Sequence, residues 1–567
     1  MYKVVSVEQM RQIEAAADAS GLSYDQLMQN AGRALAERVK ALLAEAPDPN
    51  DASITVLVGP GNNGGDGLVA GRILAEETSA LVRFYLLKPR DENDANFKAV
   101  RDANLFIANA EDDQRYRVLT NMVASATIII DALFGIGVKL PLRDEVAKVL
   151  RHVQQAIHET ESEPFTVLAQ PSQRRSARPY IIAVDCPSGL DCDTGEIDQN
   201  ALHADETVTF IAAKPGQFIF PGAQAVGKLT ISHIGVSANT EGLRDEKRVI
   251  ADAQSVRELL PARPADANKG TFGKVLVVGG SVNYTGAAAL CAMSAYRAGA
   301  GLVTVGAPGP VVSALAAHIL EATWLLLPHD LGVIASSAAT LLKEELPKYD
   351  SLLIGPGMGR EKTTRELLEG LFEQQSKTMP SRRVIGFAAV KSEVNETKAD
   401  TEIKLPPLVI DADGLNLLSE IDDWWTLLPE ETIITPHPGE MARLAKMEIA
   451  DVQANRWQLA VEKAAEWKVI LVLKGAHTLI AHPDGRVAVL PFKESALATA
   501  GTGDVLAGII AGLRAQGLQP FDAALVGGYL HQLAGAEAVR KVGNARSVVA
   551  GDVLDSIADA YRLLEQA

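Results

Sequence analysis

The chain has 567 residues, and 54 Lys plus Arg against 71 Asp plus Glu give it a formal net charge of −17. Hydrophobic residues make up 47% and charged residues 22%, a folded protein's composition that excludes disorder as the main state. The acidic balance argues against a general nucleic-acid binder, which needs cations to displace phosphate counterions. The length predicts three to four domains of about 150 residues, or two if the units are large α/β domains.

Cysteine usage and the apolar stretches bear on the location of the protein. Cys186, Cys192 and Cys291 are too few for a disulfide framework, and we expect each to be a small buried hydrophobic residue. The N-terminus lacks the basic flank and apolar core of a signal peptide. The uncharged stretches 275–296 and 298–320 are interrupted by polar residues, Gly or Pro, so neither is expected to span a membrane. The sequence therefore predicts a soluble, cytoplasmic protein.

The first part of the chain predicts an α/β domain. Helical periodicity over 6–19 and 24–47 predicts two N-terminal helices. Short apolar runs that alternate with helical stretches then predict parallel strands covered by helices on both faces. These strands are expected at 53–59, 83–87, 127–133, 180–185 and 206–212.

A second alternation follows the polar segment 236–265, which we expect to be irregular. We place a domain boundary near 236–246, so that residues 1–240 and 246–567 form two α/β domains. The polar segments 159–179 and 376–404 are expected to be surface insertions. Strands of the second domain are expected at 274–280, 301–307, 351–357, 407–414, 431–438 and 469–475.

The glycine-rich segment Gly59–Gly67 lies between a predicted strand and a predicted helix. Glycines permit positive φ and a close approach of ligand, and a helix N-terminus favours phosphate. The segment matches neither the G-x-G-x-x-G fingerprint nor the Walker A pattern. A tight turn without a ligand is the alternative, but junctions of this kind are where open α/β sheets bind ligands.

Polar residues follow two further strands of the first domain. Asp131 ends one strand, and Asp185 and Ser188 follow another, with Asp193 beyond them. The carboxyl ends of parallel strands converge on the ligand crevice, although Asp185 and Asp193 could instead cap helices. Oxygen donors without His or Cys suit a hard cation such as K⁺ or Mg²⁺.

The Gly59–Gly67 segment and the strand ends at Asp131 and at Asp185 to Ser188 together resemble the NAD(P)H-hydrate epimerase family over residues 1–240. The segment LMQNAGRA at 27–34 is part of this resemblance. The family usually has Glu where this chain has Gln29. The resemblance implies K⁺ held by Asn63, Asp131 and Ser188, and we take Asp185 as the candidate base. It implies contacts to hydrated nicotinamide dinucleotide by Asn62, Asn63, Gly64, Gly65, Asp66, Gly135, Ile136, Gly137, Val138, Lys139, Leu140, Pro141 and Asp185.

The strongest pattern of the second domain is Gly501-Thr502-Gly503-Asp504, at the start of an apolar helix. Backbone amides at that helix start could bind transferring phosphate, and Asp504 could take the proton of an attacking hydroxyl. A plain acid that favours the helix N-terminus is the alternative.

Further polar residues of the second domain gather at strand ends. They are Asp411, Asp413, His437 and Lys474. The glycine-rich segment Gly355–Gly359 also lies at the end of a predicted strand. Lys474 could contact a nucleotide phosphate or be a structural lysine that extends to solvent. His437, between two prolines, could contact a ligand or be structural.

This set resembles the ADP-dependent NAD(P)H-hydrate dehydratases of the ribokinase-like superfamily over residues 250–567. The chain departs from that family at Asn268, where His is frequent, and at Glu494-Ser495, which replaces Asn-Pro. The resemblance implies substrate contacts at Ala287, Gly357, His437 and Asp504. It implies nucleotide contacts at Lys474, Gly475, Ala476, His477, Thr478 and Gly503.

Both halves together resemble bifunctional NAD(P)H-hydrate repair enzymes. The resemblance implies a Rossmann-like three-layer domain that epimerises the hydrates, with K⁺. It also implies a ribokinase-like domain that uses ADP, with Mg²⁺, to dehydrate the S epimer. We expect small-molecule ligands, no nucleic-acid or membrane partner, and a homo-oligomer. The alternative is a ribokinase-like small-molecule kinase fused to a nucleotide-binding or scaffold domain.

Overall fold

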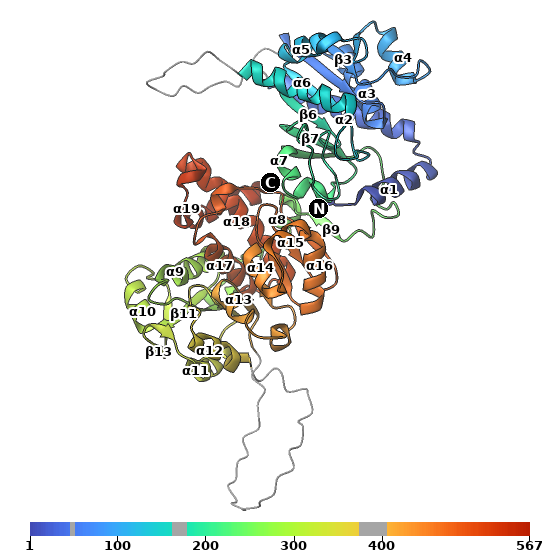
Figure 1. Cartoon of the computed structure of the whole chain (residues 1–567). Coiled ribbons are helices and arrows are strands. Elements are labelled where there is room, and N and C mark those ends of the chain that lie inside the picture. Colours follow the sequence, from blue (N-terminus) through green and yellow to red (C-terminus); the bar gives the residue numbers. More distant parts are fainter. Residues whose placement is uncertain (46–50, 162–177, 373–404) are drawn as a thin grey trace, which may run out of the picture. The chain divides into compact units, whose positions relative to one another are not determined.

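A computed structural model describes residues 1–45, 51–161, 178–372 and 405–567 (Figure 1). The chain folds as two compact units, Tyr2–Glu246 and Lys247–Ala567, the second also taking in Met1. We call them the N-terminal unit and the C-terminal unit. The division lies at the end of the predicted boundary segment. The predicted insertion 376–404, and most of 159–179, lie outside the described residues.

The N-terminal unit contains a parallel sheet in the order β4-β3-β2-β5-β6-β7-β8. Its strands are β2 (Ser53–Val58), β3 (Leu81–Leu86), β4 (Phe106–Asn109), β5 (Ile128–Ala132), β6 (Tyr180–Val184), β7 (Glu206–Phe210) and β8 (Lys228–Ser232), after the short β1 (Tyr2–Lys3). Its helices are α1 (Val7–Ala19), α2 (Tyr24–Ala44), α3 (Asn62–Glu77), α4 (Ala95–Asp102), α5 (Arg117–Ala124), α6 (Asp144–Glu161) and α7 (Gly222–Ala225).

Helix capping and an apolar stripe explain why the first helices form where predicted. Ser6 Oγ accepts a hydrogen bond from the Gln9 amide at 3.2 Å, and Gln9 Oε1 accepts one from the Ser6 amide at 2.8 Å. These two hydrogen bonds cap α1. Met10, Ile13 and Ala17 are buried at helical spacing on one face of α1. The apolar faces of α1, α2 and α3 cover one side of the sheet, while α5 and α6 cover the other (Figure 1).

The glycine-rich segment is helical where the sequence suggested a loop. Helix α3 already begins at Asn62, and Gly64, Gly65 and Gly67 lie inside it with negative φ, so the expected positive φ is wrong. Close approach explains the glycines instead, because a Cβ on Gly67 would lie 2.6 Å from Ala132 Cβ. The helix N-terminus therefore lies directly against the end of the sheet.

The C-terminal unit contains a longer sheet in the order β9-β20-β19-β18-β17-β16-β15-β10-β11-β12. It is parallel from β12 to β18, and β19 pairs antiparallel with both of its neighbours. The strands are β9 (Arg248–Ile250), β10 (Lys274–Val278), β11 (Leu302–Pro308), β12 (Thr323–Leu327), β15 (Ser351–Ile354), β16 (Leu408–Ile410), β17 (Ile433–Ile434), β18 (Ile470–Leu473), β19 (Leu479–Ala481) and β20 (Val487–Val489), with the separate hairpin β13 (His329–Asp330) and β14 (Val333–Ile334).

Helices pack against this sheet, and its core includes α9, α17 and α18. The helices are α8 (Ala253–Arg257), α9 (Thr285–Arg297), α10 (Gly309–Leu315), α11 (Ala338–Glu345), α12 (Lys362–Phe372), α13 (Asp413–Leu418), α14 (Pro438–Ala445), α15 (Ile449–Ala454), α16 (Arg456–Trp467), α17 (Thr502–Ala515), α18 (Pro520–Val542), α19 (Ala550–Asp555) and α20 (Ile557–Gln566). Strand β9 and helix α8 lie within 236–265, so the expectation of an irregular segment is wrong there.

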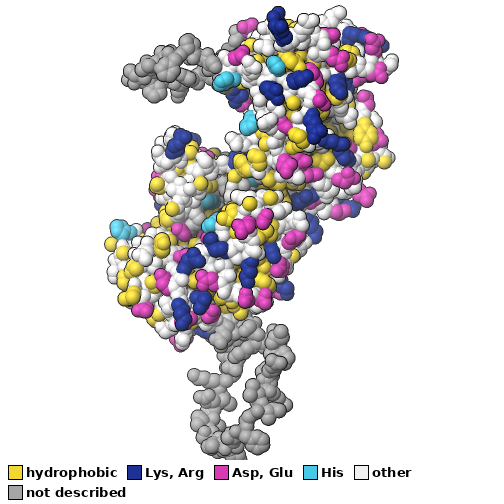
Figure 2. Space-filling model, viewed as in Figure 1, with side chains coloured by type: hydrophobic (Ala, Val, Ile, Leu, Met, Phe, Trp, Pro, Cys, Tyr) yellow, Lys and Arg dark blue, Asp and Glu magenta, His cyan; other side chains and the backbone are white. Residues whose placement is uncertain are grey.

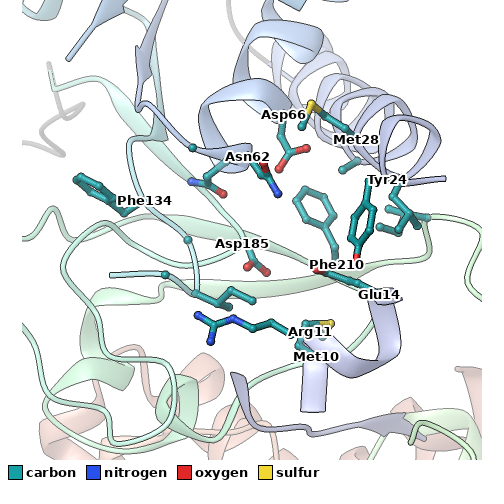
Figure 3. Close-up of a pocket in the computed structure, with 18 of the residues that line it drawn as sticks. Met10, Arg11, Glu14, Tyr24, Met28, Asn62, Asp66, Phe134, Asp185 and Phe210 are labelled. Atoms are coloured by element: carbon teal, nitrogen blue, oxygen red, sulfur yellow. The ribbon is translucent and has the colours of Figure 1, made fainter. Parts of the chain in front are cut away.

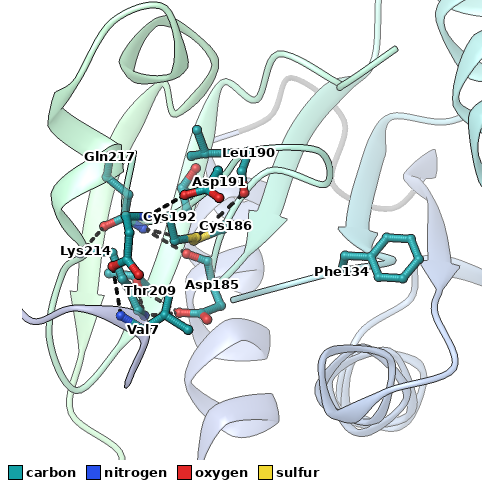
Figure 4. Close-up of a disulfide and its surroundings, with 12 residues drawn as sticks. Val7, Phe134, Asp185, Cys186, Leu190, Asp191, Cys192, Thr209, Lys214 and Gln217 are labelled. Carbon is teal, nitrogen blue, oxygen red and sulfur yellow. Dashed lines mark hydrogen bonds and ion pairs between the residues drawn. A yellow bond between two sulfur atoms is a disulfide. The ribbon is translucent and has the colours of Figure 1, made fainter. Parts of the chain in front are cut away.

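The cysteines are buried as predicted, but two of them are paired. The structure joins Cys186 and Cys192 in a disulfide within the turn that follows β6, while Cys291 is free (Figure 4). This pairing corrects the expectation that each cysteine acts only as a separate hydrophobic residue. The turn brings the two sulfur atoms together next to Asp185 and Gln217 (Figure 4).

Charged side chains of both signs are interspersed over the visible face of the protein (Figure 2). Among the described residues, no helix is both long enough and apolar enough to cross a membrane.

Helices α9 and α17 approach so closely that one glycine has no room for a side chain. A Cβ on Gly508 would lie 2.0 Å from Ser294 Oγ and 2.3 Å from the Cys291 carbonyl oxygen. We predict that Gly508→Ala lowers the free energy of unfolding of the C-terminal unit by about 1–3 kcal/mol through overpacking.

Urea unfolding followed by tryptophan fluorescence measures this effect, because all five tryptophans lie in the C-terminal unit. Gly551→Ala is the matched control, since nothing lies within 4 Å of its added Cβ. Equal unfolding midpoints for the two variants would contradict the prediction.

Candidate active sites

A cavity of about 470 Å³ lies at the carboxyl end of the N-terminal sheet (Figure 3). Helices α1 and α2 form one wall, and the start of α3 and the turn after β5 form the other. Its polar lining residues are Arg11, Glu14, Tyr24, Asn62, Asn63, Asp66, Asp185 and Lys214.

The structure brings together about half of the residues predicted to contact the first ligand. Those lining the cavity are Asn62, Asn63, Asp66, Gly135, Ile136, Gly137 and Asp185. Gly64, Gly65, Val138, Lys139, Leu140 and Pro141 are outside this lining. Gly64 and Gly65 instead pack tightly, since Cβ atoms there would lie 2.0 Å from the Gly59 carbonyl oxygen and 2.5 Å from Met28 Sδ. These residues were predicted to contact the ligand only because they lie next to other motif residues in the sequence.

Asp185 is held rigidly at the floor of the cavity. Its backbone is left-handed, with φ of 64°, an uncommon conformation for a residue other than glycine. Its Oδ1 atom accepts from Lys214 Nζ and from Thr209 Oγ1, the latter at 2.9 Å. Gln217 Nε2 donates to the Asp185 carbonyl oxygen at 2.9 Å. These bonds leave little freedom for the carboxylate.

Two more carboxyl groups face Asp185 across the cavity (Figure 3). Burial raises the pKa of Asp66 well above its usual range, and the nearby Asp185 and Glu14 raise it further. Burial also raises the pKa of Glu14, as does Asp185, while Lys214 and Arg11 lower it in part. The cavity thus combines one ion-paired carboxylate with two carboxyl groups whose pKa values are raised.

The three predicted K⁺ ligands come from the carboxyl ends of the adjacent strands β2, β5 and β6. The fully buried Asp131 accepts from the Ser188 amide at 2.8 Å and from Ser188 Oγ at 2.6 Å. Burial raises the pKa of Asp131, although the bonds from Ser188 oppose that rise. Asn63 Nδ2 is buried without a hydrogen-bond partner in the described part of the chain. Oxygen donors around a buried carboxylate fit a hard monovalent cation.

Gln29, where the epimerase family usually has Glu, does not reach the cavity. Its Nε2 atom donates to Asn96 Oδ1 at 2.8 Å, which ties α2 to α4. The amide therefore has a structural partner at this position.

The C-terminal unit gathers charged groups at the ends of β16 and β18. Lys474 Nζ lies 2.8 Å from Asp411 Oδ1 and 3.8 Å from Glu440 Oε2. Thr435 Oγ1 donates to the same Asp411 oxygen at 2.7 Å. Burial alone would lower the pKa of Lys474, but Asp411 and Glu440 outweigh it and raise that pKa.

Asp504 lies in the first turn of α17, next to this cluster. Burial raises the pKa of Asp504 to about 7, and Asp411 adds to the rise while Lys474 opposes it. A Cβ on Gly503 would lie 3.4 Å from Lys474 Nζ and 3.9 Å from Asp411 Oδ2. Glycine at 503 therefore leaves the space beside the Lys474–Asp411 pair open.

The predicted substrate residues of this unit differ in what they contact. Gly357 and Ala287 come together, because a Cβ on Gly357 would lie 2.9 Å from Ala287 Cβ. His437 caps α14, where its Nδ1 accepts from the Gly439 amide at 3.0 Å. Its Nε2 lies 3.5 Å from Glu440 Oε1, and the side chain as a whole is half exposed.

In the predicted nucleotide-binding segment 474–478, mainly backbone groups are accessible to a ligand. Gly475 and Ala476 are exposed, whereas the His477 ring is buried, with Nδ1 3.2 Å from the Leu490 carbonyl oxygen. Burial lowers the pKa of His477 to about 4, so this histidine is neutral. Thr478 Oγ1 donates to the Gly475 carbonyl oxygen.

The two departures from the dehydratase family make local bonds. Asn268 Oδ1 accepts from the Gly270 amide at 2.8 Å, and Glu494 Oε1 accepts from the Ala496 amide at 3.0 Å. Both side chains cap short helical turns.

Comparison with known proteins shows the family. Residues 24–216 match the family described as YjeF-related protein N-terminus, and residues 275–558 match NAD(P)H-hydrate dehydratase. The bifunctional NAD(P)H-hydrate repair enzyme Nnr of Moorella thermoacetica is 35% identical over an alignment that covers 100% of this chain and 98% of that protein. The chain belongs to the bifunctional NAD(P)H-hydrate repair enzyme family.

Other members of this bifunctional NAD(P)H-hydrate repair enzyme family align at similar length. The Coxiella burnetii enzyme is 33% identical, with 96% of each chain covered. An ADP/ATP-dependent NAD(P)H-hydrate dehydratase from Bacillus subtilis, co-crystallised with ATP and Mg²⁺, is 27% identical with a TM-score of 0.44, covering 56% of this chain and 99% of that one. The predicted Rossmann-like and ribokinase-like α/β fold classes are confirmed.

Several polar residues of the two sites were not expected from the sequence. Lys474 directly follows β18, whereas Lys214 lies four residues beyond β7, so its position in the sequence did not mark it as a site residue. Arg11, Glu14 and Tyr24 lie on helices, where no pattern distinguishes a cavity-facing polar residue from a solvated one.

The Lys474–Asp411 pair generates a stability prediction. The side chains are 17% and 2% exposed, so removal of the ammonium leaves buried carboxylates without their cation. We predict that Lys474→Met lowers the free energy of unfolding of the C-terminal unit by about 3–5 kcal/mol.

Lys468→Met is the control, because Lys468 pairs with Glu430 at side-chain exposures of 67% and 72%. Both variants are unfolded in urea at neutral pH with tryptophan fluorescence as the signal. A loss for Lys474→Met no larger than that of the control would refute the buried-pair assignment.

Proposed function

We propose that the chain repairs hydrated NADH and NADPH, with one activity in each unit. The N-terminal unit interconverts the R and S hydrates, and the C-terminal unit dehydrates the S hydrate with ADP. One observation carries the proposal: a chain with this family's full length has a separate charged site at the end of each parallel sheet. The alternative of a kinase fused to a scaffold gives no reason for the buried acids of the first cavity.

For epimerisation, the N-terminal cavity provides a base and neighbouring acids. Asp185 is fixed by Lys214 and Thr209 and would accept or return a proton at the hydrated ring carbon. Asn62, Asn63 and the 135–137 turn would position the ring, since they line the same cavity. Residues 1–240 are the proposed extent of this activity.

We assign K⁺ to Asn63, Asp131 and Ser188. These residues supply amide, carboxylate and hydroxyl oxygens, and the buried Asp131 has no basic partner among its described hydrogen bonds. A bound K⁺ would compensate that carboxylate and favour an oxygen-bearing ligand at the cavity edge.

For dehydration, Asp504 is the proposed base within residues 246–567. It would take the proton of the ring hydroxyl, whose oxygen bonds to the terminal phosphorus of ADP while AMP departs. Loss of the phosphate then restores the reduced nicotinamide, so each turnover yields AMP, phosphate and NADH or NADPH. His437, Ala287 and Gly357 would contact the hydrate.

The nucleotide would contact Gly503 and the segment Lys474–Thr478, whose exposed glycine and alanine leave backbone groups accessible. Within the described ranges, no cluster of three or more His, Cys, Asp or Glu could hold a metal by itself. We propose that Mg²⁺ binds chiefly through the nucleotide phosphates. A homo-oligomer and a cytoplasmic location remain predictions.

Replacement of Asp504 tests the dehydratase assignment. We predict that Asp504→Asn lowers ADP-dependent dehydration by about 10²- to 10⁴-fold, because the amide cannot accept the proton. The wild-type rate should fall as the pH drops below about 7, since Asp504 then becomes protonated.

Dehydration is followed by the absorbance of reduced nicotinamide, and epimerisation by chromatography. Asp522→Asn, a change of the same kind on α18, should leave both rates near wild type. Near-wild-type dehydration by Asp504→Asn would exclude Asp504 as the base.

The K⁺ assignment makes a separate prediction. In salt-depleted protein, K⁺ should restore epimerisation more effectively than Na⁺, and Asp131→Asn should weaken this response because an anionic oxygen is lost. Epimerisation in the presence of tetramethylammonium serves as the ionic-strength control. An equal rate in rigorously K⁺-free buffer would rule out the cation site and leave the dehydratase assignment untouched.

A further inference from the structure

Lys214 is the most deeply buried charged group of the N-terminal cavity. Its side chain is 1% exposed, and its Nζ atom contacts Asp185 Oδ1 and lies 2.7 Å from Thr209 Oγ1. Gln217 links the pair, because its Oε1 accepts from the Lys214 amide and its Nε2 donates to the Asp185 carbonyl oxygen (Figure 4). Lys214 and Asp185 are therefore held in fixed positions relative to each other.

This arrangement leaves the two oxygens of Asp185 in different surroundings. Oδ1 accepts from both Lys214 and Thr209, whereas Oδ2 has no hydrogen-bond partner among the described residues. A Cβ on Gly135 would lie 3.3 Å from Oδ2 and 3.0 Å from Asn63 Oδ1. Oδ2 therefore borders the part of the cavity that glycine at 135 keeps open.

Asp66 faces the same space from α3 (Figure 3). Its carboxyl group makes no hydrogen bond within the described residues, and burial together with Asp185 and Glu14 raises its pKa well above the usual range. The other titratable groups that line the cavity are Arg11, Glu14 and Tyr24, on α1 and α2. An ion-paired carboxylate, Asp185, and a carboxyl group with a raised pKa, Asp66, therefore border one cavity, as an acid and a base would.

We propose that Lys214 is a positioning residue that holds Asp185 by Oδ1 and leaves Oδ2 toward the substrate, and that Asp66 is the proton donor opposite it. The inference rests on the proposed epimerase function of the N-terminal unit.

The step balances without an external reactant. Asp66 gives its proton to the hydroxyl on the hydrated ring carbon, the C–O bond breaks, and water leaves with the electron pair. The lone pair of the ring nitrogen stabilises the resulting cation. Water then bonds to the opposite face and gives its proton to Asp185 Oδ2. Proton exchange with solvent restores both carboxyl groups, so no atom or electron is gained or lost.

The test uses the full-length chain without nucleotide, so that dehydration does not remove either epimer. Epimerisation of a single purified hydrate epimer is measured by chromatography from pH 5 to 9. We expect Lys214→Met to lower the rate about 100-fold at pH 7 and to move the acid limb of the profile upward by at least one pH unit. Lys214→Arg keeps the positive charge and should return the limb toward wild type. Asp66→Asn should lower the rate and abolish the alkaline limb.

Arg38→Met is the matched control, because it breaks another partly buried pair of this unit, with Glu206, away from the cavity. It should leave the pH profile unchanged, and circular dichroism confirms folding of each variant. An unshifted acid limb in folded Lys214→Met, or a retained alkaline limb in Asp66→Asn, would overturn the inference. If Lys214→Met does not fold, the acid limb of Lys214→Arg and the alkaline limb of Asp66→Asn test the inference instead. A wild-type chain that epimerises neither hydrate would instead overturn the proposed function.

Discussion

Each unit holds one lysine ammonium against one buried aspartate at the carboxyl end of its parallel sheet. Lys214 meets Asp185 in the N-terminal unit, and Lys474 meets Asp411 in the C-terminal unit. In both cases a threonine hydroxyl donates to the same aspartate oxygen that the lysine contacts. Removal of these charges from water is costly, and only close pairing with further hydrogen bonds offsets that cost. The sheets fix this pairing, because strand ends bring residues distant in sequence together.

Burial, and next the aspartates of these pairs, raise the pKa of the other acidic groups of both sites. One lysine cannot compensate all the carboxylates around it, so the remaining ones shift toward the neutral form. Asp66 shows this in the first cavity, and Asp504 in the second, where its pKa is raised to about 7. A carboxyl group with a pKa near neutrality exchanges protons readily at physiological pH. Burial thus gives these acids the raised pKa values that the proposed proton transfers require.

The sequence predicted the central strands and the residues that directly follow them. Asp131, Asp185, Asp411 and Lys474 all lie at sheet ends, as the strand–helix alternation indicated. Buried parallel strands are long apolar runs, and such runs are visible without a structure.

The missed features lack such a signal. Edge strands such as β4 and β8 are half exposed, and their apolar runs are short. Lys214 lies four residues beyond β7, and only the structure shows the chain turning back to Asp185. Glu14 reaches the cavity from an amphipathic helix whose polar face otherwise points to solvent. The early start of α3 was missed because its glycines favour loops and are explained only by tight packing.

Division of labour between the two sites is the central claim, and a mixture of both hydrate epimers tests it most directly. The full-length chain and its Asp185→Asn variant are incubated with this mixture and ADP, and both epimers, AMP and phosphate are followed by chromatography. The account predicts that the wild-type chain consumes both epimers with one AMP and one phosphate for each reduced nicotinamide formed. The variant should consume the S epimer and leave the R epimer. A stable phosphorylated product, or equal consumption of both epimers by the variant, would contradict it.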